Sequence, residues 1–420
     1  MGKQLEEALT LRELCKATKQ CKKGVLWKDS VANHYLRALT KNKKLKDEVE
    51  SGRYRLSPYT VFEIYEPKRR TICATKMRDR VLQRSITNNG VREELTRSFI
   101  YDNGACVRDR GKDFTVCRTQ CLLERYFRRY GDWDGWAAHL DVKSYFPNTP
   151  HEEIIRVLRE RVRDKDFLPI LEEIIESYED QRPAEEIAAD EHGARGIGLG
   201  SELSQLVQLA LLDPIDHLIK ERCRPDIYVR YMDDFLIVCR ERAKLEEIAG
   251  VIETELHKLG HRCVNKEGVY PLRRGVKFLK LHFLLTETGA VRIKLDDRSM
   301  SRERQQLRNF ARMIRDGRRS MADVRRHYQS WISMVKPYDA GGALRKMDET
   351  YAELFGEKPQ YRYRRRKHRH GNRKRRKSTA DPGAAAQRRA AGGEPKTAGS
   401  HGLCGDDGLS GAAGRGGREP

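Results

Sequence analysis

The chain of 420 residues lacks any long apolar run. No stretch approaches 18 consecutive apolar residues, and the N-terminal segment MGKQLEEALT has no apolar core of signal-peptide length. These absences argue against a membrane-spanning protein and against a secretory signal. We therefore expect a soluble, cytoplasmic protein with no membrane partner.

The ten cysteines include no CxxC pair, and no Cys/His group has the spacing of a zinc finger. The sequence therefore gives no indication of a structural zinc site. The thiols are expected to be free, in a reducing compartment. With a hydrophobic fraction of 38%, the chain is long enough to build ordinary apolar cores for two or three domains.

Acidic residues are too few to balance the basic ones. The chain has 62 Asp and Glu against 84 Lys and Arg, a formal net charge of +22. This excess predicts attraction to a polyanion, most commonly nucleic acid, the alternative being a merely basic surface.

A dense block of positive charge lies at residues 361–377 (YRYRRRKHRHGNRKRRK), before a segment rich in Gly, Ala, Arg and Pro. We expect residues 359–420 to form a disordered basic tail that adds affinity for phosphates. The alternative is a solubilising or incidental extension.

Several segments in the middle of the chain have the residue pattern of β-strands. Residues 137–146 predict a strand ending near an acidic residue, and DIYVRYMDDFLIVCR predicts a hairpin with acids at its tip. KFLKLHFLL and AVRIKL predict the two strands of a further hairpin.

Helical patterns alternate with these strands. A capping box is expected at 149–152, a helix with a kink or break at Pro214, and another helix at 243–259. The order predicts an α+β fold, with a split βαβ sheet that carries helices on one face. Three amphipathic helices over 302–357 are expected to form a small bundle.

Three aspartates lie at the ends of apolar runs: Asp141, Asp233 and Asp234. Two carboxylates at a hairpin tip repel each other, and a divalent cation removes that cost. Asp233 and Asp234 alone could be a solvated turn, but a neighbouring strand would bring Asp141 beside them. Such carboxylates, with the backbone carbonyl of Val142, can hold two Mg²⁺ ions (or Mn²⁺) about 3.5–4 Å apart for in-line nucleotidyl transfer.

The segment Tyr231-Met232-Asp233-Asp234 resembles the YxDD box of reverse transcriptases, and LDVKSYF at 140–146 resembles their first palm motif. The likeness continues, in the family's order, over most of residues 55–345. It implies an RNA-directed DNA polymerase with a right-hand fold, whose partners are template RNA, a DNA primer and dNTPs.

The resemblance also implies how the chain divides into domains. The fingers and an N-terminal extension would occupy 1–136, and the palm 137–297, with 196–205 and its helix shared with the fingers. A helical thumb would occupy 298–358, ahead of the basic tail.

Several roles carry over from the family by position. Phe146 falls where the family places a steric gate against the ribose 2′-hydroxyl, and Lys68 and Arg70 fall where it grips the triphosphate. Lys266 resembles a lysine that protonates pyrophosphate. For each, the alternative is a structural one: a core ring, a solvated basic turn or an ordinary surface lysine.

The primer grip of the family is matched at Phe278, Leu279 and Lys280, where Lys280 replaces the usual glycine. This replacement puts close approach of the primer backbone in doubt, although a lysine could contact a phosphate instead.

The segment 196–205 distinguishes groups within the family. Many members carry Gln-Gly and end in Ser-Pro there, whereas this chain has Leu199-Gly200 and ends at Gln205. This pattern is similar to that of diversity-generating retroelement enzymes. The resemblance implies that these three residues contact the nucleotide and that copying is error-prone. It also implies a small basic accessory protein and a bacterial or phage origin. An aliphatic Leu199 cannot hydrogen-bond a nascent base pair, so discrimination should weaken. The alternative is a packing residue.

Two other functions remain open at this point. A defence-associated or group II intron-like bacterial reverse transcriptase would share the palm motifs without a mutagenic role. A non-catalytic RNA-binding relative would explain the charge and the tail, but not the presence of all three aspartates.

Overall fold

The computed structural model describes residues 2–65, 70–180, 182–198, 201–265 and 267–360. Helices and sheets both contribute to it, which confirms the predicted α+β class. Within this part of the chain, no helix is both long and apolar enough to cross a bilayer. The predicted basic tail lies almost entirely outside the described residues.

A central antiparallel sheet organises the middle of the chain. Its strand order is β4-β5-β3-β6, and β7 also pairs with β3. The strands are β4 (Ile227–Tyr231), β5 (Asp234–Cys239), β3 (Trp136–Val142), β6 (Cys263–Asn265) and β7 (Tyr270–Pro271). The hairpin predicted around the acidic pair is therefore present as β4 and β5, which are joined by only Met232 and Asp233.

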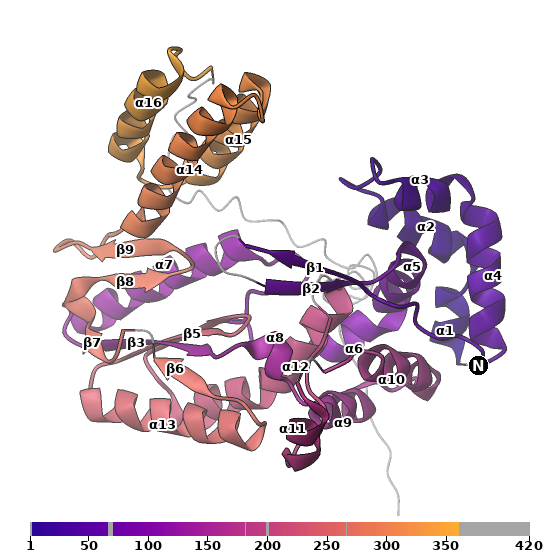
Figure 1. The fold of residues 1–420 in the computed structure, drawn as a ribbon. Helices are drawn as coiled ribbons and strands as arrows, with labels where there is room; N and C mark the ends of the chain where they lie inside the picture. Colours follow the sequence, from indigo (N-terminus) through magenta and orange to yellow (C-terminus); the bar gives the residue numbers. More distant parts are fainter. Residues whose placement is uncertain (1, 66–69, 181, 199–200, 266, 361–420) are drawn as a thin grey trace, which may run out of the picture. The chain divides into compact units, whose positions relative to one another are not determined.

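Alternation along the strands sends side chains into two separate cores, because successive residues point to opposite faces. Leu236 and Val238 pack on the face covered by α7 (Lys112–Tyr130), and Phe235 and Ile237 pack on the face covered by α13 (Arg242–Lys258). Figure 1 shows α13 under the sheet and α7 over it. The prediction of helices on one face only was therefore wrong.

The predicted capping box at 149–152 is also wrong. The helix α9 (His151–Arg161) has Pro150 as its N-cap and no side-chain cap. Thr149 is fully buried, and its hydroxyl donates instead to the Tyr145 carbonyl oxygen at 2.7 Å. The Thr149 hydroxyl, which the sequence pattern assigned to the N-terminus of α9, is therefore engaged elsewhere in the buried core. Between β3 and α9 lies the short helix α8 (Tyr145–Asn148).

The long helix α12 (Glu202–His217) continues through Pro214, so the break that the sequence allowed there does not occur. A helical proline removes one backbone hydrogen bond, but most of this helix is buried, so packing holds it together. The helix changes only at Leu218, where a short π-helical segment, η3 (Leu218–Cys223), begins. The helix predicted at 243–259 is confirmed as α13.

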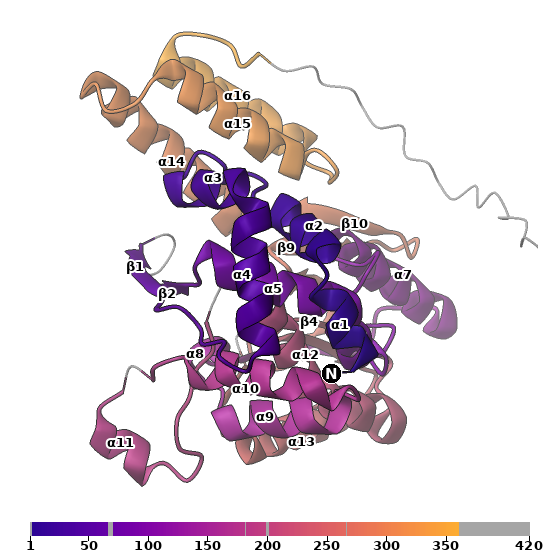
Figure 2. The ribbon, with the colours of Figure 1, turned by 90° about the vertical axis from the view of Figure 1, so that its right-hand side faces the viewer.

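The N-terminal third is mainly helical. Figure 2 shows α2 and α4 lying beside α5, and their buried side chains join those of α9, α10 and α12 in one core. A two-stranded hairpin of β1 and β2 interrupts these helices. The elements up to residue 96 are α1 (Lys3–Ala8), α2 (Leu11–Cys21), α3 (Asp29–Leu36), α4 (Ala38–Glu50), β1 (Thr60–Ile64), β2 (Arg70–Ala74), α5 (Met77–Ile86), η1 (Thr87–Val91) and α6 (Arg92–Thr96). Later in the chain, α9 is followed by η2 (Lys165–Phe167), α10 (Leu168–Glu176) and α11 (Ala184–Ala189).

The segment KFLKLHFLL forms two strands rather than the one predicted. A turn at Leu279 and Lys280 separates β8 (Val276–Phe278), which follows η4 (Leu272–Arg274), from β9 (Leu281–Leu285). The strand β10 (Val291–Leu295) then completes a three-stranded sheet. The predicted bundle is confirmed as α14 (Asp297–Arg315), α15 (Met321–Val335) and α16 (Gly341–Phe355), which share a core of their own.

Candidate active site

Asp141 and Asp234 lie directly opposite each other on neighbouring strands. They are partners in the antiparallel register of β3 and β5. Such partners have Cα atoms about 4.5–5.5 Å apart and side chains on the same face. Asp233 precedes Asp234 in the two-residue turn, and its carbonyl oxygen accepts a hydrogen bond from the Val142 amide at 3.3 Å. Asp141 thus meets the adjacent pair Asp233 and Asp234, which is distant from it in sequence, at one end of the central sheet.

The donor chemistry of this site fits magnesium, because carboxylate and backbone carbonyl oxygens are the ligands that Mg²⁺ prefers. Among the described residues, however, no group of three or more His, Cys, Asp or Glu side chains is already arranged to hold a metal ion. Carboxylates without a cation repel each other, which favours side-chain directions that point apart. Coordination by Asp141, Val142, Asp233 and Asp234 stays a prediction.

His139 is a neighbour of the aspartates that the sequence reasoning did not identify. Its Nε2 atom lies 3.1 Å from Asp234 Oδ1, and both side chains are largely buried. The imidazole ring also meets the edge of Phe278, with ring centroids 5.6 Å apart. A sequence signal existed, because residues two apart in a strand share a face, and His139 stands two residues before Asp141.

Arg230 is a second neighbour missed at the sequence level. This guanidinium donates to the Met232 carbonyl oxygen at 2.9 Å and forms a fully buried ion pair with Asp216 of α12. Its signal was a single charge inside an otherwise apolar strand, since charged groups are rarely buried unless they are paired.

The predicted primer-grip residues form the turn between β8 and β9. Phe278 is fully buried against the central sheet, whereas the Lys280 side chain is exposed. Leu279 and Lys280 both have positive φ angles, 53° and 63°. The Phe278 ring links this hairpin, through His139, to Asp234.

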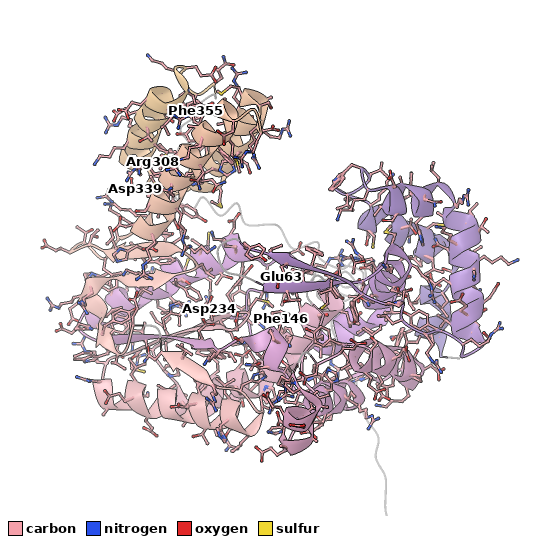
Figure 3. The ribbon with its side chains drawn as sticks, viewed as in Figure 1. Glu63, Phe146, Asp234, Arg308, Asp339 and Phe355 are labelled. Carbon is pink, nitrogen blue, oxygen red and sulfur yellow. The ribbon has the colours of Figure 1, made fainter. Side chains whose placement is uncertain are left out.

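Phe146 is half-buried in α8, directly after β3. Its carbonyl oxygen accepts from the Ile197 amide at 3.2 Å, which ties it to the segment before Leu199. The adjacent Tyr145 is buried and donates to the Gln208 carbonyl oxygen at 2.6 Å. Figure 3 shows Phe146 at α8 and Asp234 on the central sheet. The predicted gate is therefore held by backbone contacts on a short helix that follows the Asp141 strand.

Gln205 lies in the first turns of α12 and is contacted by Cys106. The thiol donates to Gln205 Oε1 at 3.0 Å. Burial, with a smaller contribution from the Glu202 carboxylate, raises the pKa of Cys106 to about 11. The thiol therefore keeps its proton at neutral pH and can orient the Gln205 amide.

Four of the other predicted site residues lie outside the described residues: Lys68, Leu199, Gly200 and Lys266. The backbone of Arg70 begins β2, opposite Ile64.

One family model covers more than half of the chain. The family model for "Reverse transcriptase (RNA-dependent DNA polymerase)" matches residues 66–279, just over half of the chain. This match includes β3, β4, β5 and the turn that carries Asp233.

Two curated proteins are similar over parts of the chain. The "Putative COX1/OXI3 intron 2 protein" of Saccharomyces cerevisiae is 24% identical over 186 residues, which are 43% of this chain but only 20% of that protein. "Protein YkfC" of Escherichia coli is 22% identical over 285 residues, covering 54% of this chain and 72% of that protein. The chain thus spans about a fifth of the yeast relative's length.

Among solved structures, telomerase from Candida albicans, in complex with a fragment of telomeric RNA, overlaps 77% of this chain and 64% of its own. The TM-score is 0.41 and the identity 13%.

Proposed function

Because this chain belongs to the reverse transcriptase (RNA-dependent DNA polymerase) family, we propose that it synthesises DNA on an RNA template, with Asp141, Asp233 and Asp234 as its catalytic carboxylates. The observation that carries this proposal is the register that sets Asp141 opposite Asp234, with Asp233 in the adjoining turn. The partners in the reaction are template RNA, a DNA primer and dNTPs.

The domain assignment follows the right-hand fold of this family. Nearly all of the central sheet lies in the proposed palm, 137–297, and so does α13, which covers one of its faces. The helices α1 to α7 and the β1–β2 hairpin lie in the proposed fingers and N-terminal extension, 1–136. The proposed thumb, 298–358, contains nearly all of the α14–α16 bundle, and the basic tail follows it.

The proposed reaction is in-line nucleotidyl transfer. The primer 3′-oxygen forms a bond to the α-phosphorus of the dNTP as the bond to pyrophosphate breaks, and the 3′-hydroxyl proton passes to solvent water. When bound at the three aspartates, two Mg²⁺ ions, or Mn²⁺ in their place, would supply charge neutralisation for this transfer. Lys266 would donate a proton to the departing pyrophosphate.

The neighbouring residues have proposed roles in positioning the substrates. Lys68 and Arg70 would grip the triphosphate through charge-assisted hydrogen bonds. The Phe146 ring would exclude a ribose 2′-hydroxyl. The turn at Leu279 and Lys280 would contact the primer, with the exposed Lys280 ammonium facing a phosphate.

The deciding experiment is primer extension on an RNA template with Mg²⁺. We expect Asp233→Asn to lower the rate by about a thousandfold, the scale seen when electrostatic stabilisation is removed from an active site, while RNA affinity is retained. Asp339→Asn is the matched control, because it makes the same chemical change at an exposed carboxylate paired with Arg292. Synthesis that survives in Asp233→Asn would refute this site assignment.

A finer proposal concerns fidelity. We propose that the enzyme copies with frequent errors, as diversity-generating retroelement enzymes do, and acts with a small basic accessory protein. This proposal is supported by the residues Leu199, Gly200 and Gln205 in the segment 196–205. Leu199→Gln should restore a polar contact beside the nascent pair and reduce misincorporation opposite template adenine. An error spectrum that is the same in both enzymes would contradict a role for Leu199.

A further inference from the structure

The side chain of Arg230 is completely buried directly beneath the turn that carries Asp233. Arg230 is the fourth residue of β4, on the face that packs against α12. Its Nε atom donates to Asp216 Oδ1 at 2.7 Å, and the Tyr228 hydroxyl donates to the same oxygen at 2.6 Å. A further nitrogen lies 3.3 Å from the Leu209 carbonyl oxygen. Together with the Met232 contact of Nη1, these bonds give each nitrogen of the guanidinium group a hydrogen-bond acceptor.

An ion pair in this position is not explained by stability alone. Removing two charges from water costs several kcal/mol per ion, and apolar residues of similar volume often replace such pairs without loss of stability. Apolar residues could not reproduce the hydrogen bond to the backbone of the turn, in which Arg230 Nη1 donates to the Met232 carbonyl oxygen at 2.9 Å.

The turn that receives this hydrogen bond is conformationally demanding. Met232 has a φ angle of 57°, in the left-handed region that side chains other than glycine rarely adopt. Both carbonyl groups of the turn are held, since Met232 oxygen accepts from Arg230 and Asp233 oxygen accepts from the Val142 amide. The two donors come from different strands, β4 and β3. Rotation of the Met232–Asp233 peptide would break the Arg230 contact and redirect Asp233.

We propose that Arg230 is a positioning residue that locks the Met232–Asp233 peptide and so sets the direction of the Asp233 and Asp234 carboxylates. Asp216 holds the guanidinium in place from α12, so the helix that begins near Gln205 also supports the catalytic turn. This inference rests on the proposed function, in which those carboxylates are catalytic. It adds a residue that touches neither substrate nor metal.

The test replaces the ion pair without leaving an unpaired charge: Arg230→Met combined with Asp216→Leu. Tyr228→Phe is the matched control, because it removes a hydrogen bond to the same Asp216 oxygen but leaves the Met232 contact intact. Thermal unfolding first establishes that each variant is folded. The readouts are kcat and KM for dNTP, Mn²⁺ binding to the full-length protein by electron paramagnetic resonance, and amide hydrogen exchange over residues 231–234.

In the double variant we expect kcat to fall about ten- to hundredfold, the rate equivalent of one charge-assisted hydrogen bond, with a much smaller change in KM. Mn²⁺ binding should weaken, and exchange at 231–234 should quicken. Tyr228→Phe should match the wild type in all three. A folded double variant with wild-type kcat, Mn²⁺ affinity and exchange would overturn the proposal.

A second variant and the exchange measurement cover the cases in which the double variant does not fold or the wild type is inactive. If the double variant does not fold, Arg230→Lys keeps the positive charge beside Asp216, but its single nitrogen cannot reproduce the guanidinium fork. Faster exchange at 231–234 in that variant supports the inference, and unchanged exchange counts against it. If the wild type extends no primer, the proposed function fails, while the exchange measurement still decides the role of Arg230.

Discussion

At the scale of single residues, two positions in this chain have properties set by their surroundings rather than by residue type. Phe146 follows the Asp141 strand, its carbonyl oxygen accepts from the Ile197 amide, and its half-buried side chain packs against two of the cores. His261 is almost fully buried, and within the described part of the chain its two ring nitrogens make no hydrogen bond. Each environment leads to a measurable expectation.

Phe146→Val should admit ribonucleotides, because a smaller side chain leaves room for the 2′-hydroxyl. We expect the preference for dNTP over NTP to fall about ten- to hundredfold, as for other small changes in pocket volume. Competition between dGTP and GTP in primer extension measures this ratio, with Phe355→Val in α16 as the control. An unchanged ratio would mean that Phe146 is only a packing residue.

His261 should make stability depend on pH. Burial, followed by the charges of Arg195 and His192, lowers the pKa of His261 to about 3, whereas the unfolded chain has its ordinary value of about 6.5. The unfolded state therefore binds more protons between these values, and stability is lost as pH falls from about 6.5 towards 3. It is fully present above pH 6.5.

We expect His261→Leu to lose less stability than the wild type between pH 7.5 and pH 5. Urea unfolding at the two pH values measures the difference. Equal losses in the two proteins would show that His261 is not the group responsible.

At the scale of elements, the β8–β9 turn places Lys280, where the resemblance led us to expect glycine, in a backbone conformation that suits glycine. Lys280 replaces a glycine, yet its φ angle of 63° is one that glycine adopts without cost. The hairpin thus keeps a tight two-residue turn and gains an exposed cation. What could keep the primer backbone from approaching closely is therefore the Lys280 side chain, and not the backbone conformation of the turn.

The helix α15 depends on its first turn. The Ser320 side chain accepts from the Asp323 amide, and the Asp323 carboxylate accepts from the Ser320 amide, which forms a capping box. Ser320→Ala should destabilise this helix by about 1 kcal/mol. Hydrogen exchange of the first amides of α15 measures the effect, and Ser333→Ala, on the same helix, is the control. Equal protection in the two variants would contradict the cap.

At the scale of the whole molecule, the excess positive charge leads to one expectation about binding. Residues 361–377 contain 11 Lys and Arg and no acid. Removing everything after residue 358 should make the affinity for template RNA less dependent on salt, because fewer counterions are released on binding. Titration at several salt concentrations gives the slope, and a neutral Gly/Ser tail of equal length is the control. If both chains keep the full-length slope, the tail has no electrostatic role.

The sequence by itself determined the α+β class, the β4–β5 hairpin and the α14–α16 bundle, because these depend on local periodicity and on turn residues. It also singled out Asp141, Asp233 and Asp234, since each stands where an apolar run ends. These features need only the order of neighbouring residues along the chain.

Only the tertiary structure decided which side chains serve the aspartates. Strand register set Asp141 opposite Asp234, packing between sheets brought Phe278 to His139, and burial against α12 paired Arg230 with Asp216. Long-range contacts also bury Thr149, whose hydroxyl does not cap α9, and they stabilise α12 on both sides of Pro214. Contacts between segments far apart in the chain leave no period or spacing in the sequence, so their partners became visible only once the chain was folded.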